Sequence, residues 1–432
     1  MPANKDEEIS FFPTKKFFVE TLTKDVDLNA AILDLIDNSI DNYSIRSLTG
    51  RKKISITFNS KTFCIEDNCG GMDFDKVRNE IFRLGAVKPE KSGTIGYYGI
   101  GLKRAMFKIG KNIELESDDG DKYFSIVVDE KWLNNDENWH KGFEEIDLSK
   151  GESMFKMTVK SLYPDVAEEF GSTTFQEDLI DKIREVYTIY IQKQFDIFVN
   201  SISVDPYEFK FLDDGEKFSA LREEKELDGV KVQIVAGFTR ESGLVGWTVF
   251  CNDRIVLMNN KSYKTGFIDV NFHPYQDNEF LGMVFFNSED PSILPMNTTK
   301  DDIAPGNKFY KSVQPRMGEI TKNLIQGLTR RIYEARDSEG EIIGKSVYEN
   351  IGTKPWYDIS LKKEAKFPKL KISKDKKEEI ETVKYTTISY QVEKKDIKKV
   401  KKHMGNPWMS NKNVGWKTYQ FYKKIEDMVS IT

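Results

Sequence analysis

The chain has 432 residues, of which 39% are hydrophobic and 31% charged, a composition typical of a globular protein with two or three domains. No stretch approaches the roughly 18 consecutive apolar residues of a membrane span, and the amino-terminal residues lack the pattern of a signal peptide. The three cysteines and three histidines show no spacing typical of a disulfide framework or a zinc site, which favours a reducing, cytoplasmic compartment.

An apolar lead-in precedes a first long helix, which we expect to include residues 31–42. At about 100° per residue, its isoleucines and leucines fall on one side. The opposite side is polar and consists of Asp34, Asp37, Asn38 and Asp41. Short carboxylates and an amide one turn apart suit a magnesium ion and a polarised water. A solvent-exposed polar face is the alternative interpretation.

A hairpin is expected from the strand-like runs 54–58 and 63–65, and it breaks into an acidic turn with two glycines, residues 67–73. Asp67 lies where the second strand ends, so its carboxylate could accept a hydrogen bond from an exocyclic amine. The alternative is that Asp67 only caps the turn before Gly70 and Gly71.

A glycine-spaced loop that runs into a helix follows at residues 93–108. Its glycines are Gly96, Gly99 and Gly101. Glycines remove side chains where backbone N–H groups must approach phosphate oxygens, and the helix from about Leu102 would present its positive end to the anion. Lys103 and Arg104 add full charges. The spacing fits neither the P-loop nor the Rossmann pattern, and a flexible turn is the alternative.

Further strands are expected at 113–116, 123–128 and 154–160, with a surface excursion at 132–140 and a domain boundary near 163–178. Beyond it, the sequence predicts an amphipathic helix from Leu179. Strand-like runs follow at 195–199, 230–235, 246–256 and 282–286, and a helix begins at about Gly318. Strands followed by a helix predict a second domain of α+β type.

The three ordered motifs resemble those of the GHKL ATPases, named for gyrase, the heat-shock chaperone, histidine kinases and MutL, from about Phe11 to Tyr333. The wording is closest to the MORC-like and MutL-like branches. The resemblance implies an α+β protein whose first domain, residues 1–165, is a Bergerat-type two-layer α/β sandwich that binds ATP. A transducer-like domain related to ribosomal S5 follows at 175–335, and residues 336–432 form a basic extension or small module.

The resemblance also implies roles for individual residues. Asp34 would polarise the attacking water, Asn38 would bind Mg²⁺, and Lys300, in the run Pro-Met-Asn-Thr-Thr-Lys, would reach the γ-phosphate from the second domain. The remaining candidates for nucleotide binding are Asp41, which supports the site, Asp67, Gly71 and Met72 at the adenine, Gly96, Gly99, Gly101 and Lys103 at the phosphates, and Thr158 as a weak candidate for the fourth family motif.

Two positions depart from the family pattern. Asp34 stands where most relatives have Glu, and its shorter side chain predicts slow turnover, because a misplacement near 1 Å can cost about 100-fold in rate. Cys69 replaces the first glycine of Asp-x-Gly-x-Gly. It either adopts an ordinary backbone conformation or narrows the base pocket.

The function that these features imply is a slow, Mg²⁺-dependent ATPase that acts as an ATP-gated clamp. By resemblance, the clamp is a homodimer formed through the amino-terminal domain, acts on DNA, and works with a nuclease or antiviral defence partner. A chaperone-like ATPase that remodels a protein client is the alternative. A histidine kinase is disfavoured, because no histidine precedes His140 to accept the phosphate.

The net charge of −5 is unevenly distributed, since residues 361–402 contain fifteen lysines against seven acidic residues. Aromatic residues alternate with lysines just beyond. Lysines displace counterions and rings stack on bases, so residues 361–424 suit nucleic acid. Docking onto a protein and a simple solvated surface are the alternatives.

Overall fold

The computed structural model describes residues 14–83, 94–96, 99–214, 219–241, 243–267, 279–334, 351–361, 392–404, 411, 414–415, 417–419 and 421, with side chains in helix α8 described as far as residue 325. The described residues up to 361 form one compact unit, and those from 392 belong to a second. Within these ranges, none of the helices combines the length and hydrophobicity needed to cross a membrane.

The helices of the first unit are α1 (Lys15–Thr23), α2 (Leu28–Ile45), α3 (Phe74–Lys76) with a π-helical turn (Val77–Ile81), α4 (Gly101–Ile109), α5 (Glu130–Leu133), α6 (Pro164–Phe170), α7 (Thr173–Lys193) and α8 (Lys308–Glu334), with 3₁₀ turns at Tyr263–Thr265, Pro291–Ile293 and Trp356–Asp358. The described helix of the second unit is α10 (Lys394–His403).

The strands are β1 (Lys52–Asn59), β2 (Thr62–Asp67), β3 (Gly110–Asp118), β4 (Lys122–Val128), β5 (Glu145–Leu148), β6 (Met154–Leu162), β7 (Phe195–Val199), β8 (Ile202–Ser203), β9 (Lys210–Leu212), β10 (Leu221–Leu227), β11 (Val230–Phe238), β12 (Gly246–Cys251), β13 (Arg254–Asn260), β14 (Phe280–Asn287) and β15 (Thr353–Pro355).

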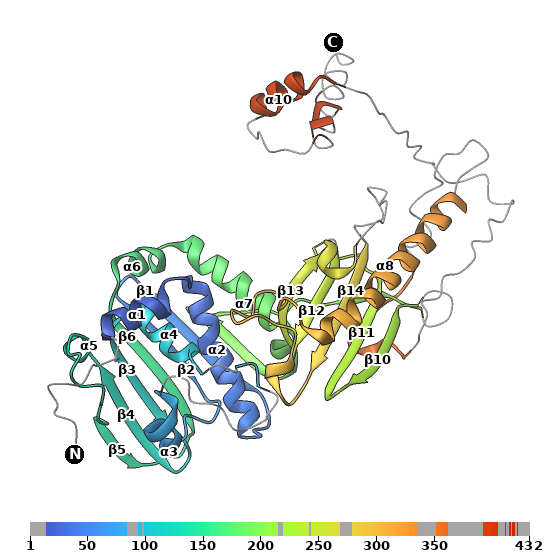
Figure 1. The fold of residues 1–432 in the computed structure, drawn as a ribbon. Helices are drawn as coiled ribbons and strands as arrows, with labels where there is room; N and C mark the ends of the chain where they lie inside the picture. The colour runs from blue at the N-terminus through green and yellow to red at the C-terminus, as the bar shows by residue number, and fades with distance from the viewer. Residues whose placement is uncertain are drawn as a thin grey trace, which may run out of the picture. The chain divides into compact units, whose positions relative to one another are not determined.

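The first sheet has eight strands in the order β5-β4-β3-β6-β2-β1-β7-β8, and helices α1, α2 and α4 lie over one of its faces (Figure 1). Alternation along the strands explains the two layers. Ile54, Ile56 and Ile65 are buried in the core beneath the helices, whereas the opposite face is polar and includes the ion pair between Lys156 and Glu116. The predicted mixed α+β class is confirmed.

The first sheet extends further along the chain than expected. β7, predicted for the second domain, pairs in parallel with β1, and β8 completes the sheet at residue 203. The predicted boundary at 165–175 therefore does not coincide with the end of this sheet. Parallel pairing joins strands that are far apart in sequence, so no local turn pattern announces it.

The second sheet has the order β10-β11-β14-β12-β13 and is covered on both faces. Trp247 faces helix α8, where its indole N–H donates to the hydroxyl of Thr321 at 2.8 Å. On the other face Phe250, Phe285 and Trp356 stack in succession. Residues 351–361 thus pack on this sheet, although the sequence analysis assigned them to the carboxy-terminal segment.

Helix α8 begins ten residues before Gly318, the position predicted as its start. Gly318 lies inside the helix. A Cβ at this position would stand 3.0 Å from the Gly266 carbonyl oxygen, which explains why the residue is a glycine. The glycine thus permits close packing and does not mark a helix end.

The predicted surface excursion at 132–140 anchors the amino-terminal helix. The Lys15 ammonium is 1% exposed, donates to the carbonyls of Trp132, Asn135 and Asn138, and lies 3.8 Å from the centre of a Trp132 ring. Phe18, one turn later, packs edge-on against Phe107 of α4. The excursion therefore fixes α1 against the helix that follows the glycine loop.

Candidate functional site

The polar side of α2 is buried, so the solvent-exposed alternative is wrong for this helix. Asp34, Asp37 and Asp41 are only 4%, 1% and 3% exposed. Ionised carboxylates removed from water must be paired or hydrogen-bonded, because the cost of desolvation is otherwise several kcal/mol each. The structure supplies those partners from five other segments of the chain.

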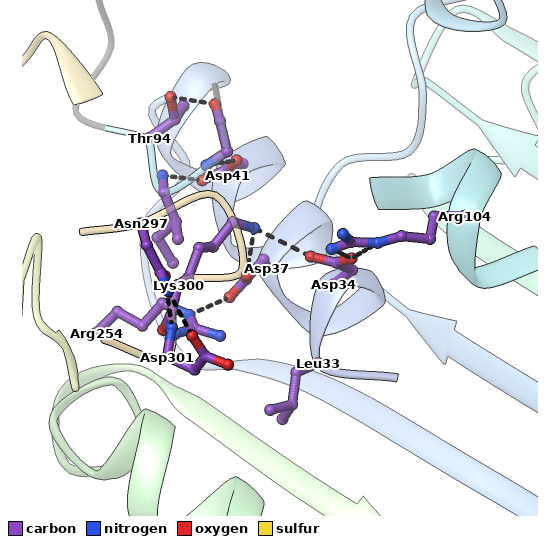
Figure 2. A network of polar contacts seen from close by, with 12 residues as sticks. Leu33, Asp34, Asp37, Asp41, Thr94, Arg104, Arg254, Asn297, Lys300 and Asp301 are labelled. Atoms are coloured by element: carbon purple, nitrogen blue, oxygen red, sulfur yellow. Dashed lines mark hydrogen bonds and ion pairs between the residues drawn. The ribbon is translucent and has the colours of Figure 1, made fainter. Parts of the chain in front are cut away.

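Asp34 is paired with two cations from different elements. One carboxylate oxygen accepts from the guanidinium of Arg104 on α4, and the other lies 3.2 Å from the Lys300 ammonium (Figure 2). The approach of α4 depends on Gly101, where a Cβ would stand 3.2 Å from the Asp34 carboxyl carbon. The structure therefore brings together Asp34, Gly101 and Lys300, three residues that sequence reasoning singled out separately.

Asp37 is the centre of the second set of pairs. Its oxygens accept from Lys300 at 2.6 Å, from the Nε of Arg254 at 3.0 Å and from the hydroxyl of Tyr187 at 2.6 Å. Burial by itself would raise the pKa of Asp37, but the charges of Arg254 and Lys300 lower it below its ordinary value, so the carboxylate stays ionised. Sequence reasoning missed Arg254 and Tyr187.

The Lys300 loop is rigidly built. Lys300 has a left-handed backbone with φ of +59°, unusual for a lysine, and its N–H donates to the carbonyl of Asn297 at 3.1 Å. The Asn297 and Thr299 side chains both bond to one oxygen of Asp301, at 2.7 and 2.6 Å. Arg254 donates to the Lys300 carbonyl. The backbone is thus held at both sides of Lys300.

Arg254 owes its place to a tight hairpin between β12 and β13. The two turn residues, Asn252 and Asp253, both have positive φ, 46° and 66°, the geometry that matches the twist of a two-residue hairpin. The Asn-Asp pair between apolar runs was the available signal for this turn. Nothing local indicated that the next residue would reach α2.

Asp41 holds the end of the glycine loop. Its carboxylate accepts from the backbone N–H groups of Ile95 and Gly96, at 2.5 and 2.8 Å. Asn252 donates to the neighbouring carbonyl of Thr94 at 3.0 Å, which links the second sheet to the same loop. Gly99 has φ of +65°. Most of the preceding segment, predicted as the mobile part of an ATP lid (83–92), lies outside the described residues.

Lys103 was predicted to bind phosphate, but it is Arg104, the next residue, that contacts the Asp34 cluster. The Lys103 ammonium donates to the carbonyls of Ile81 and Arg83, at 2.6 and 3.3 Å, whereas Arg104 contacts Asp34. A direct role of Lys103 at the phosphates stays a prediction.

On the opposite side of α2, the described residues that donate hydrogen bonds to Asp67 are all neutral. Ser39 of α2 donates its hydroxyl to one carboxylate oxygen at 2.6 Å, and the N–H of Cys69 donates to the other at 2.8 Å. Burial raises the pKa of Asp67 to about 6, because these hydrogen bonds offset the desolvation only in part. Ser39 was not among the predicted residues.

The turn after Asp67 requires its second glycine. Gly71 has φ of +64°, and a Cβ there would lie 1.9 Å from the Asp118 carbonyl oxygen. Asn42 donates to the carbonyls on either side of Gly70, at 2.9 and 2.6 Å. The N–H of Met72 donates to Ser117 at 2.7 Å, and its side chain packs on the core.

Two further predicted positions are placed as follows. Cys69 is absent from the residues with positive φ, so it adopts an ordinary backbone conformation, and burial raises the pKa of its thiol. Thr158 lies opposite Cys64, while Asp67 lies opposite Phe155. Because neighbouring strand residues point to opposite faces, the structure does not bring Thr158 and Asp67 together.

Asn38 has a side-chain amide nitrogen that is buried and has no hydrogen-bond partner among the described residues. Such a donor is costly to leave unpaired, and it suits an acceptor such as a phosphate oxygen, because an amide nitrogen cannot ligate a cation. Hard oxygen ligands suit Mg²⁺, which usually takes one or two protein ligands and completes its shell with water and phosphate. The side-chain oxygen of Asn38 is the atom that could ligate Mg²⁺, while the unpaired N–H is free to donate to a phosphate oxygen, so Asn38 fits a magnesium–phosphate group.

The charges of the network also favour an anion. Three buried cations, Arg104, Arg254 and Lys300, contact two buried carboxylates, Asp34 and Asp37. These contacts thus include one more cation than carboxylate, close to the start of α4, where the helix dipole adds partial positive charge.

Comparison with known protein families agrees with this geometry. Residues 26–158 match the family described as histidine kinase-, DNA gyrase B-, and HSP90-like ATPase, a range that runs from just before α2 into β6. No curated protein matches the chain significantly. The match includes Asp34, Asn38 and Asp67 but neither Arg254 nor Lys300. Residues 26–158 therefore contain a GHKL-type ATPase domain, which supports ATP binding by an ATP-using enzyme.

Proposed function

We propose that the chain hydrolyses ATP with a catalytic site completed by its second domain. The observation that carries this proposal is the contact between Lys300 and Asp34, which are 266 positions apart and meet in a buried cluster. An ammonium fixed beside a candidate base can neutralise charge on a transferring phosphoryl group. The second domain thus acts as a transducer-like domain, as in the MORC-like and MutL-like proteins that the sequence resembles.

Asp67 would bind the adenine. Its buried carboxylate can accept from the exocyclic amine, and Ser39 and the Cys69 N–H hold it in place. The triphosphate would then extend along α2 toward the start of α4 and Lys300. Its negative charge compensates the positive excess of Arg104, Arg254 and Lys300.

Asp34 would orient the attacking water. Arg104 holds one of its oxygens, so the oxygen that now faces Lys300 is the one available to accept a proton from water once the ammonium contacts phosphate. Water adds to the γ-phosphorus as the bond to the ADP oxygen breaks. The short reach of aspartate makes slow turnover the expected behaviour.

Asn38 would hold Mg²⁺ together with phosphate oxygens. When bound, the ion neutralises phosphate charge and orients the chain of phosphates. Asn38 would contribute its side-chain oxygen to the ion, and its amide N–H, which has no partner among the described residues, would donate to a phosphate oxygen.

The wider activity that we propose is an ATP-gated, cytoplasmic homodimeric clamp on DNA, with a nuclease partner in antiviral defence. Helix α10 supports the DNA contact, because its lysines, from Lys394 to Lys402, are largely exposed on one short helix. Exposed lysines attract phosphates and release counterions. A chaperone-like ATPase acting on a protein client is the second candidate, since the description of the family that residues 26–158 match includes HSP90-like as well as DNA gyrase B-like ATPases.

One experiment tests hydrolysis and separates the two clients. ATP turnover of the full chain is measured alone, with duplex DNA, with single-stranded DNA and with an unfolded protein, each at two salt concentrations. DNA stimulation that weakens at high salt supports the clamp, and stimulation by unfolded protein alone supports the chaperone. Absence of turnover under every condition would refute the ATPase.

A further inference from the structure

Asp37 contacts the Lys300 ammonium but has no role in the proposed hydrolysis. It lies three residues after Asp34 on α2, and its carboxylate takes the closer position to the Lys300 ammonium, 2.6 Å against 3.2 Å (Figure 2). Lys300 is therefore shared between two carboxylates. A phosphate that recruits Lys300 must compete with both.

Arg254 keeps the Lys300 loop in place during that competition. It bonds to Asp37 through Nε and to the Lys300 carbonyl through the other side of its guanidinium. The backbone of Lys300 is thus fixed, while its four-carbon side chain keeps rotatable bonds. A small rotation of the side chain is enough to exchange one acceptor for another.

Tyr187 weakens the hold of Asp37 on Lys300. Its hydroxyl lies 2.6 Å from the Asp37 oxygen that also accepts from Arg254, and 2.8 Å from the carbonyl oxygen of Leu33. The nearer and charged carboxylate is the stronger acceptor for the single hydroxyl proton, while Lys300 contacts the other Asp37 oxygen. The Tyr187 hydroxyl is fully buried and its pKa is raised by burial and by Asp37, so it stays a donor. Each donor to a carboxylate reduces the negative charge available to the next.

From these contacts we infer that Asp37 is a positioning residue, which holds Lys300 ready beside Asp34 and releases it to the terminal phosphate when nucleotide binds. This inference rests on the proposed ATPase function. It adds that part of the nucleotide's binding energy is used to displace Lys300 from Asp37, so Asp37 opposes nucleotide binding while keeping the second domain attached through Arg254.

The test is the affinity of the full chain for a non-hydrolysable ATP analogue with Mg²⁺, measured by calorimetry. Asp37→Asn removes the competing charge and should tighten binding at least about fivefold. Tyr187→Phe removes a donor, strengthens the grip of Asp37 and should weaken binding. Asp302→Asn is the matched control, because this nearby carboxylate pairs with Lys264, and it should leave the affinity unchanged.

A double-mutant cycle separates positioning from a general structural role. In a Lys300→Ala background there is no ammonium to release, so Asp37→Asn should no longer tighten binding. An equal effect of Asp37→Asn in both backgrounds, or weaker binding by a folded Asp37→Asn protein, would overturn the inference. If Asp37→Asn does not fold, the opposite sign for Tyr187→Phe decides. Failure of the wild type to bind the analogue would refute the proposed function itself.

Discussion

The two sides of helix α2 treat charge in opposite ways. On one side, Asp34 and Asp37 face three cations from other elements, and these charges lower the pKa of Asp37. On the other side, Ser39 helps to hold Asp67, whose donors among the described residues are neutral and whose pKa lies at about 6. We infer that the side of Asp34 and Asp37 suits phosphate chemistry, whereas the side of Ser39 and Asp67 suits a base and responds to pH.

The largest effect on turnover should come from the side of α2 that carries Asp34 and Asp37. Asp34→Ala removes the group that orients water, so turnover should fall by about 100- to 10,000-fold. Nucleotide affinity should be kept, because the cations that face phosphate remain. Steady-state turnover and analogue affinity are measured together. Unchanged hydrolysis would show that Asp34 does not orient the attacking water, and it would overturn the contrast between the two sides of α2.

The second effect tests the contribution of the other domain. Lys300→Ala should lower turnover by roughly 100- to 1,000-fold, because a fixed charge on the transferring group is lost. Lys300→Arg is the control, since it keeps the charge but changes the shape of the group. Equal turnover of wild type and Lys300→Ala would mean that the buried contact with Asp34 is only structural.

A change at Asp67, on the opposite side of α2, should affect the affinity for ATP. Asp67→Asn replaces the accepting carboxylate with a neutral amide and should weaken ATP binding by about 10- to 100-fold. Turnover at saturating ATP should change far less than in Asp34→Ala. A loss of turnover without a loss of affinity would contradict the division of roles between the two sides of α2.

The smallest expected effect is the pH dependence of ATP affinity that Asp67 causes. Because the pKa of Asp67 is raised to about 6, the carboxylate is protonated below that pH and ATP affinity should fall, by up to about tenfold per pH unit. The sign follows from the need for the ionised form as acceptor. Calorimetric titrations from about one pH unit below to about two units above this pKa measure it.

Two variants provide the controls for this pH response. Ser39→Ala removes a hydrogen bond that lowers the pKa, so the midpoint should move upward. Asp67→Asn should leave only the pH dependence of the nucleotide's own phosphates. The same pH profile in Asp67→Asn and wild type would exclude Asp67 as the titrating group.

Sequence periodicity predicted the sides of α2, the β1–β2 hairpin and the glycine loop, because each depends on neighbours a few residues apart. It could not decide whether Asp34 faces water, since its partners lie 70 and 266 residues away. Family resemblance, not periodicity, pointed to Lys300. Neither periodicity nor family resemblance pointed to Arg254, because nothing in the local sequence indicates that an arginine at the start of a strand is buried.

The glycines teach the same lesson. Gly101 was expected to admit phosphate, yet its nearest neighbour is the Asp34 side chain, so its small size serves the approach of two helices. The glycine pattern pointed to a loop next to Asp34, and the packed structure shows a steric reason for Gly101 that the pattern did not contain.

The anchored lysine of α1 affects how amino-terminal truncations should be interpreted. Removing residues 1–16 would delete Lys15, strand the three carbonyls that accept its protons, and loosen α1 from α4, the helix that supplies Arg104. Lost activity after such a cut would therefore report damage inside a single subunit as readily as failed pairing between subunits. A shorter cut that spares Thr14 and Lys15 isolates the pairing question.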